Sequence, residues 1–450
     1  MKKSIFHIVI FWAFVAGGTL PLVAQPVTDS NWVKEVRTVM LNKNGVELEP
    51  PVLPLTDPWA PSGNGDDRLL LRFDVLGPEV ENYRYQIRHC DRDWNLDDME
   101  PYDFMNGFDE GPIENSGSSF TTTVPYVHYY QYLPGENSRL LLSGNYVVFV
   151  YPQGFPDSIL LSRRFCVTEE SVKVLTEETV PYDNASIRQR RELDVTVGEN
   201  PEYRSTTLLP PTLNPQYLHV VVQQNGRLDL RRQLPFTGYE QGQLCYRNRP
   251  ENIFFGSNTF RWFDISNIRT AMYNVCQIRD FGGEWYALLC PLENRSRKPF
   301  ITETVLNGGM KVNVWDRSDK QHEADYVYVN FALPMEHPYL DGNIHVVGDL
   351  TQWQINEHSR MEYNMEMKAY TLRLLLKQGY YAYQLLFVPS VGQADSHPVS
   401  GFKPRESLTE RLEGDHYETR NTYYVHVYYH GPADRYDRLV GYVRVTPQTF

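Results

Sequence analysis

Short runs of alternating apolar and polar residues recur along the chain, and this pattern is typical of β-strands with one buried face. Clusters of Gly, Pro, Asn and Asp separate the runs, and helical spacing sustained over three turns is almost absent. The clearest runs lie at 68–75, 83–89, 144–151, 217–223, 326–333, 370–376 and 423–429. We therefore expect an all-β protein of stacked β-sandwiches.

Shifts in composition divide the chain into three consecutive β-sandwiches, of immunoglobulin-like or early-Set-like type. A polar stretch at 169–178 follows the last strand pattern of the first module. A turn signal at Asn307-Gly308-Gly309 lies in a second polar stretch, which leads to the third module. The predicted sandwiches occupy residues 25–170, 171–320 and 321–450.

The N-terminus has the layout of a secretory signal peptide. Lys2 and Lys3 precede an apolar run from Ile5 to Val15, and we place the cleavage after Ala24. The apolar run has about eleven residues, whereas a membrane-spanning helix needs about 20. No second run of spanning length follows. We expect residues 1–24 to be removed and the mature chain to be exported without a transmembrane segment.

Charge and cysteine content narrow the range of partners and scaffolds. The formal net charge is −13, whereas nucleic-acid backbones and anionic lipid surfaces favour clusters of Lys and Arg. We therefore expect no nucleic-acid partner. None of the five cysteines lies in a CxxC or Cys/His pattern with metal-ligand spacing. A bridge between Cys276 and Cys290 is conceivable across neighbouring strands, but buried free thiols are the favoured interpretation.

The chain lacks the short motifs that indicate catalysis or cofactor binding, such as GxSxG, HExxH, a phosphate-binding glycine loop or a dinucleotide fingerprint. The acidic run 91–98 resembles the start of a calcium loop, but Leu96 and Tyr102 replace the required Gly and Glu. A hydrolase could use Asp109, Glu110 and His128, yet His128 is better explained as a packed residue with a hydrogen-bond partner. We expect no catalytic, cofactor or metal site.

The most specific local pattern lies in the third predicted module. A strand ends in GDLTQW at Trp353, and a later hairpin reads KQGYYAYQ from Lys377. Both motifs resemble those of early-Set glycogen-binding modules, in which the matching tryptophan stacks on sugar. The second aromatic face that a sugar platform needs is missing from 389–398. A periplasmic glycan-binding protein that uses Trp353, Tyr381 and Tyr383 is therefore the alternative function.

Several stretches together resemble one family, the plug protein of the Bacteroidetes type IX secretion system, formerly a domain of unknown function. The stretches are HCD at 89–91 with Trp94, NGF at 106–108 with Ile113, SFTTTV at 119–124 with Tyr126, LSGNY at 142–146, ADYVYV at 324–329, GDLTQW at 348–353 and KQGYY at 377–381. The resemblance implies a non-enzymatic periplasmic protein without a cofactor, held at the periplasmic face of the outer membrane by protein contacts. It would dock on the outer-membrane translocon barrel and close the pore when no substrate is in transit.

The loop between Phe104 and Phe120 is the predicted contact surface, on composition alone. It combines acids, glycines and hydroxyls with aromatic residues. Such a mixed surface suits a partner that must detach, because a wide apolar patch cannot stay exposed. The candidate contact residues are Asn106, Phe108, Asp109 and Glu110. The following stretch, 119–130, is expected to form a strand that buries Phe120 and Val124.

Overall fold

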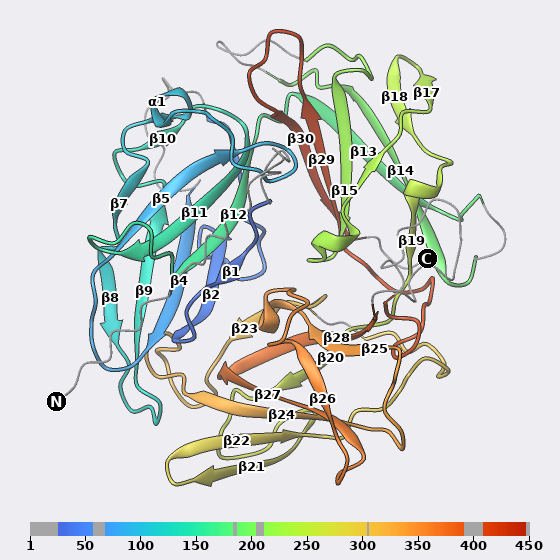
Figure 1. The fold of residues 1–450 in the computed structure, drawn as a ribbon. Helices are drawn as coiled ribbons and strands as arrows, with labels where there is room; N and C mark the ends of the chain where they lie inside the picture. Colours follow the sequence, from blue (N-terminus) through green and yellow to red (C-terminus); the bar gives the residue numbers. More distant parts are fainter. Residues whose placement is uncertain are drawn as a thin grey trace, which may run out of the picture.

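The computed structural model describes residues 26–56, 68–182, 187–203, 211–303, 306–390 and 408–446. These residues form three β-sandwiches around a common centre (Figure 1). Within the described ranges the one α-helix is a single turn, α1 (Pro101–Phe104), and short 3-10 turns occur at Leu228–Leu230, Pro250–Asn252 and Asp349–Thr351. The expected all-β fold is confirmed. The predicted signal peptide lies outside the described residues.

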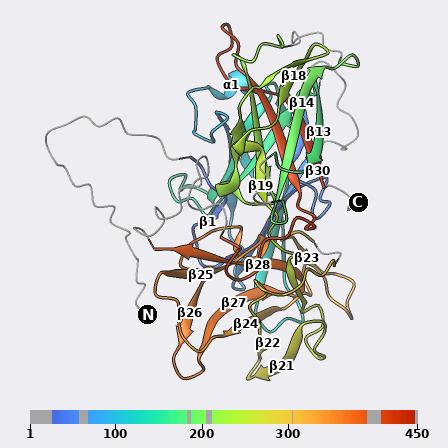
Figure 2. The ribbon, with the colours of Figure 1, turned by 90° about the vertical axis from the view of Figure 1, so that its right-hand side faces the viewer.

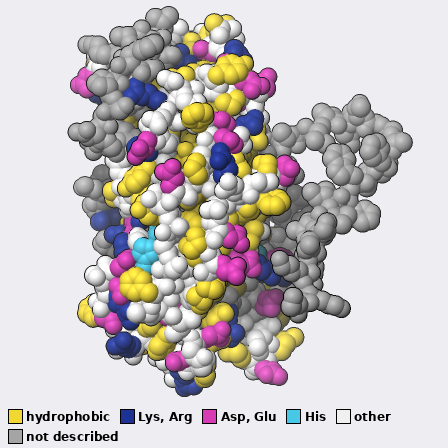
Figure 3. Space-filling model, turned by 90° about the vertical axis from the view of Figure 1, so that its left-hand side faces the viewer, with side chains coloured by type: hydrophobic (Ala, Val, Ile, Leu, Met, Phe, Trp, Pro, Cys, Tyr) yellow, Lys and Arg dark blue, Asp and Glu magenta, His cyan; other side chains and the backbone are white. Residues whose placement is uncertain are grey.

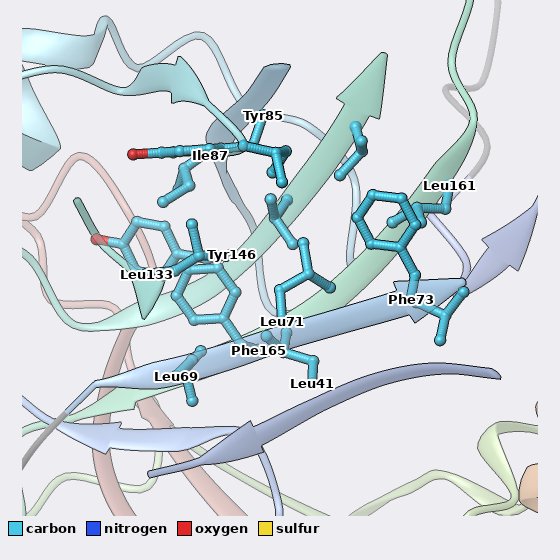
Figure 4. Close-up of a cluster of buried hydrophobic side chains, with 14 of the residues drawn as sticks. Leu41, Leu69, Leu71, Phe73, Tyr85, Ile87, Leu133, Tyr146, Leu161 and Phe165 are labelled. Atoms are coloured by element: carbon cyan, nitrogen blue, oxygen red, sulfur yellow. The ribbon is translucent and has the colours of Figure 1, made fainter. Parts of the chain in front are cut away.

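The first sandwich encloses its core between two sheets, ordered β1-β12-β11-β5-β7 with β3 beside β12, and β2-β4-β9-β8. Its strands are β1 (Ser30–Asn31), β2 (Val36–Lys43), β3 (Val52–Pro54), β4 (Leu69–Leu76), β5 (Tyr83–Cys90), β7 (Glu110–Pro112), β8 (Asn115–Ser118), β9 (Tyr126–Leu133), β11 (Gly144–Pro152) and β12 (Leu161–Thr168). A small separate sheet joins β6 (Met105–Asn106) to β10 (Arg139–Leu140). The rings of Phe73, Tyr146 and Phe165 lie in the core between the two large sheets (Figure 4).

The middle sandwich combines two distant parts of the chain. Its sheets are ordered β13-β14-β18-β17, with β19 beside β14, and β16-β15-β29-β30. The strands are β13 (Val172–Thr179), β14 (Arg190–Glu199), β15 (Leu218–Gln224), β16 (Arg232–Leu234), β17 (Gly238–Glu240), β18 (Gln243–Tyr246), β19 (Ile253–Phe255), β29 (Tyr423–Tyr429) and β30 (Arg438–Val445). The C-terminal strands β29 and β30, red in Figure 1, thus complete this sandwich by pairing with β15.

The third sandwich is inserted between those two parts. Its strands are β20 (Arg261–Asp264), β21 (Val275–Phe281), β22 (Glu284–Leu289), β23 (Met310–Val312), β24 (Tyr326–Pro334), β25 (Gly342–Val347), β26 (Arg360–Asn364), β27 (Ala369–Lys377) and β28 (Gly379–Pro389). One sheet, ordered β20-β28-β25-β26-β27-β24-β22-β21 with β23 beside β28, folds over onto itself around Phe263 and Phe331. The side view in Figure 2 shows the middle sandwich above it.

This division of the chain differs from the predicted one. The predicted boundary at 320 falls inside the third sandwich, because β20 and β23 pair with β28, and β22 pairs with β24. The predicted C-terminal module, 321–450, also contains β29 and β30, which belong to the middle sandwich. Composition does not show which strands pair when they lie so far apart in the sequence. An inserted module is therefore predicted as a consecutive one.

Cys276 and Cys290 form a disulfide, with their Cα atoms 4.8 Å apart. The favoured interpretation as free thiols is therefore wrong for this pair. Their neighbours Val275 and Leu289 are cross-strand partners in the β21–β22 hairpin, next to an irregularity in the register, and this brings the two cysteines together. The other three cysteines, Cys90, Cys166 and Cys245, are free and buried.

Candidate functional site

The predicted contact loop begins beside α1 and β10, at the end of the first sandwich that lies away from the third (Figure 1). Asn106 is exposed and pairs through its backbone with Arg139. The N–H of Phe108 donates to the Ser138 hydroxyl over 2.9 Å, and the same hydroxyl donates to the Phe108 carbonyl over 2.9 Å. The Phe108 side chain is 73% exposed. The loop therefore presents an aromatic ring from a backbone that is held in place.

The two acids of the loop bind neighbouring strands. Asp109 accepts a hydrogen bond from Gln86 over 3.1 Å. Glu110 accepts hydrogen bonds from Arg84 over 3.0 Å and from the Tyr151 hydroxyl over 2.9 Å. These carboxylates anchor the loop to β5 and β11, so Phe108 is the candidate residue that offers a large apolar surface to a partner.

Hydrophobic side chains on this side of the molecule are spread among acidic and basic ones, as Figure 3 shows. They do not gather into one wide apolar area in that view. Tyr102 of α1 is also exposed and precedes the contact loop closely in the chain. This mixed surface matches the kind expected for a reversible contact.

The segment after the loop is placed differently from the prediction. β9 begins at Tyr126, and Phe120 is exposed, its ring stacked on that of His322 in the third sandwich. The expected burial of Phe120 is therefore wrong, and Val124 is only half-buried. The reason is a contact with Asp325, whose carboxylate accepts from the N–H of Thr123 over 2.7 Å and from that of Val124 over 3.1 Å. The segment joins the first sandwich to the third.

A buried charge network reinforces that connection. Lys377 of β27 donates to Asp74 of β4 over 2.7 Å, and the Tyr326 hydroxyl donates to the same carboxylate oxygen over 2.7 Å. His128 lies 2.6 Å from the other oxygen, so it is a packed histidine with a partner, as expected. Burial alone would raise the pKa of Asp74, but the charge of Lys377 and the hydrogen bond with His128 hold it below its usual range.

Polar contacts also bind the first sandwich to the middle one. Arg438 of β30 donates to both carboxylate oxygens of Glu169, over 2.9 and 2.7 Å, and both residues are buried. The Tyr428 hydroxyl donates to the Asn145 side chain over 2.9 Å. A buried apolar cluster surrounds this interface and contains Trp94, Cys166, Val221, Tyr428 and Leu439.

The third sandwich is bound to the middle one through the chain segment that returns to β29. Glu413, in that segment, accepts hydrogen bonds from Arg261 over 2.9 Å and from Arg295 over 2.7 Å, and it is fully buried. Burial alone would raise the pKa of Glu413, but the charges of Arg261 and Arg295 hold it at about 2. The carboxylate therefore remains ionised inside the protein.

Trp353 lies where all three sandwiches meet. Its ring packs on the backbone of Gly226 of the middle sandwich, so that a Cβ added there would lie 2.2 Å from the ring. The indole N–H donates to Asp349 over 2.8 Å. The next residue, Gln354, donates to the carbonyl of Asp29 in the first sandwich over 2.6 Å. Buried contacts thus join every pair of sandwiches into one unit.

The residues of the alternative glycan interpretation do not form an open sugar platform. Tyr381 and Tyr383 are each 2% exposed and pack on Phe263 in the core of the third sandwich. Alternate residues of a strand face opposite sides, so Tyr380 is the ring that points outwards from β28. Trp353 faces the junction. Tyr381 and Tyr383, buried in this way, cannot stack on a glycan. The early-Set likeness of the module stays a prediction.

The acidic run 91–98 forms a local turn. The Asp91 carboxylate accepts hydrogen bonds from the backbone N–H groups of Asp93, over 2.8 Å, and Asn95, over 2.9 Å. Throughout the described ranges, no three His, Cys, Asp or Glu side chains cluster closely enough to hold a metal ion. No helix in the described part of the chain is long and apolar enough to cross a membrane.

Residues 36–169 match a family model described as the type 9 secretion system plug protein 1st domain. The matched residues make up nearly all of the first sandwich, which is called the plug domain below. The plug domain therefore contains the contact loop. It also takes part in two of the three buried interfaces between sandwiches. Over the longer chain, the protein is similar to a hypothetical protein from Parabacteroides merdae, whose crystal structure has 26% sequence identity and a TM-score of 0.84, with 94% of this chain and 100% of that chain covered. No curated protein matches.

Most of the sequence motifs that resemble the plug family lie at interfaces between sandwiches, whereas NGF at 106–108 lies in the contact loop. They supply Thr123 (SFTTTV), Asn145 (LSGNY), Asp325 and Tyr326 (ADYVYV), Trp353 (GDLTQW) and Lys377 (KQGYY) to the contacts between sandwiches. Sequence reasoning found these motifs but did not assign them to interfaces, because the residues that pair are far apart in the chain.

Proposed function

We propose that this protein is a non-enzymatic periplasmic component of the type IX secretion machinery. It docks on the periplasmic opening of the outer-membrane translocon barrel and plugs the opening when no substrate is in transit. The observation that carries this proposal is the match of residues 36–169 to the plug domain. The mechanism is steric, since closing a pore requires no bond to be made or broken.

The interfaces between the sandwiches support a plugging role. A pore that admits folded proteins is wide, and a cover for it must be broad and must keep its shape. Buried ion pairs such as Asp74–Lys377 and Glu169–Arg438 are costly to break, because removing one partner leaves an uncompensated buried charge. These pairs hold three sandwiches in one arrangement, so the whole width of the molecule can act as a single cover.

The contact loop supplies a surface for reversible seating. Phe108 is an exposed aromatic ring on an anchored backbone, and the polar residues Asn106, Asp109 and Glu110 lie near it in the chain. Aromatic residues contribute strongly at protein interfaces, whereas a polar surround keeps the free protein soluble. We therefore assign Asn106 and Phe108 to direct contact, and Asp109 and Glu110 to holding the loop in shape.

Co-purification tests the proposal. The tagged mature protein is captured from detergent extracts of a type IX secreting bacterium, and the bound material is examined for a very large outer-membrane barrel. We expect the barrel with the natural protein and a marked loss with Phe108→Asp. Phe155→Asp is the matched control, since Phe155 is also an exposed ring of the plug domain but lies outside the contact loop, in the turn after β11. Capture of the protein without any barrel would contradict the proposal.

A further inference from the structure

A cavity of about 500 Å³ lies at the centre of the molecule, where the three sandwiches meet. Its walls come from β12 of the plug domain, from β29 and β30 of the middle sandwich, and from the segment around Trp353 of the third. Ligand pockets are often of this size and often lie between domains. The cavity is separate from the contact loop, and the plugging mechanism does not use it.

Two polar atoms beside the cavity have no hydrogen-bond partner among the described residues. They are Nδ1 of His426 and the hydroxyl of Tyr442, and both atoms are buried. His426 is only 8% exposed, and its ring lies 5.2 Å from that of Tyr442, its cross-strand partner. Buried polar groups in proteins are nearly always paired. Two adjacent unpaired groups on a cavity wall therefore indicate a place for the polar group of a ligand.

The charges around the two open groups favour a ligand whose polar group is neutral. Burial, with the nearby charge of Arg231, lowers the pKa of His426 to about 3, so its imidazole is uncharged at physiological pH. The charged residues on the walls already have partners: Arg164 donates to Asp29 over 2.7 Å, and Arg444 lies 3.7 Å from Glu49. The cavity walls therefore have no excess of positive or negative charge that would favour an ionic ligand.

The remaining walls are largely apolar, and they suit a hydrophobic ring. They include Leu48, Pro50, Val52, Leu306, Met310 and Trp353. Aromatic and aliphatic walls with a few convergent polar groups are the usual composition of a small-molecule site. Most of the cavity wall is therefore apolar, and the two neutral polar groups lie together at one place on it.

We propose that this cavity binds a small neutral molecule that carries an apolar ring and an amide group. The amide carbonyl accepts a hydrogen bond from the Tyr442 hydroxyl, and the amide N–H donates to Nδ1 of His426. An amide both donates and accepts without carrying charge, so it satisfies both open groups at once. Because the ligand contacts all three sandwiches, its binding stabilises their arrangement.

Acetanilide is a suitable probe, because it joins a phenyl ring to one secondary amide. Its binding to the mature full-length protein is measured by ligand-observed NMR titration and by the rise in melting temperature. We expect saturable binding, at least tenfold weaker in His426→Phe/Tyr442→Phe, which keeps both rings and removes both open groups. Tyr239→Phe, at an exposed position of the middle sandwich, is the matched control and should bind acetanilide as the natural protein does.

Three results would overturn the inference: no binding of acetanilide up to its solubility limit, equal binding by the double variant, or equal binding of toluene, which lacks the amide. Should the double variant not fold, the single variant Tyr442→Phe and a crystal soaked in 4-bromoacetanilide replace it. The bromine signal is expected in the cavity, and a bromine signal elsewhere alone would contradict the assignment. Co-purification of the translocon barrel does not depend on any of these outcomes, so the two proposals fail separately.

Discussion

Lys377 and Asp74 form a buried ion pair, with Nζ 2.7 Å from Oδ2, that connects the third sandwich to the plug domain. Both side chains are 1% exposed, so neither charge can be solvated if the other is removed. The pair therefore couples the folding of the plug domain to that of a module far away in the sequence.

Lys377→Met is expected to lower the free energy of unfolding by about 3–5 kcal/mol, because it leaves Asp74 as a buried charge that has lost its cation. Urea denaturation followed by tryptophan fluorescence measures the change. The matched control is Lys368→Met, since Lys368 pairs with Glu336 on the exposed tip of the same sandwich. That change should be below about 1 kcal/mol. Similar losses in both variants would refute the role assigned to the buried pair.

The buried carboxylate of Glu413 is expected to make the stability of the fold depend on pH in the acid range. Burial alone would raise its pKa, but Arg261 and Arg295 hold it at about 2, below its ordinary value of 4.5. The ionised carboxylate therefore stabilises the fold at every pH above about 4.5, and this contribution is lost as the pH falls towards 2. The shift corresponds to about 3 kcal/mol.

Glu413→Gln should accordingly be less stable than the natural protein at neutral pH, with the difference shrinking between pH 4.5 and 2. Melting temperatures recorded across this range measure it. Glu336→Gln, at an exposed position, serves as the control and should leave the profile unchanged. If the melting temperatures of Glu413→Gln fall with acid as steeply as those of the natural protein, the depressed pKa is not the cause.

Gly226 is predicted to be required for the packing of Trp353. In Gly226→Ala the new methyl group would lie 2.2 Å from the indole ring, so the middle and third sandwiches would have to move apart. Overpacking of this kind costs about 1–3 kcal/mol. Gly238→Ala is the matched control, because the space around that glycine is open. We expect faster limited proteolysis for Gly226→Ala alone, and equal rates in the two variants would contradict the packing argument.

Phe108→Asp is predicted to weaken docking on the translocon by about 2 kcal/mol, which is roughly a thirtyfold change in dissociation constant. Its melting temperature should stay unchanged, because the ring is mostly exposed. Surface plasmon resonance with immobilised barrel measures the affinity, and Phe155→Asp should bind as the natural protein does. A thirtyfold loss in Phe155→Asp with normal binding by Phe108→Asp would place the contact in the turn after β11 and not in the contact loop.

The sequence predicted the local structure well, because alternation of apolar and polar residues depends only on neighbours in the chain. The run 423–429 coincides with β29, and 326–333 lies within β24. Partners in space were harder to predict. β29 pairs with β15, on the far side of the inserted third sandwich, and no local pattern marks such a pairing.

Side-chain roles depended on the same long-range information. The sequence makes Tyr381 a candidate for sugar contact. Which face of β28 is buried depends on the sheet that covers it, however, and Tyr381 and Tyr383 both lie on the buried face. Asp109 and Glu110 stay candidates for partner contact, and long-range pairing also gives them hydrogen bonds with Gln86 and Arg84 of β5. The roles of Asp74 and Lys377 become visible only once the two sandwiches are seen in contact.

If this protein closes the translocon pore, the ionic conductance of the purified barrel must fall when the protein is bound. The barrel is reconstituted in a planar lipid bilayer, and its conductance is recorded before and after the mature protein is added to the periplasmic side. We expect a large, saturable and reversible fall in conductance, which Phe108→Asp reaches only at a much higher concentration. A conductance that stays unchanged at saturating natural protein would contradict the account.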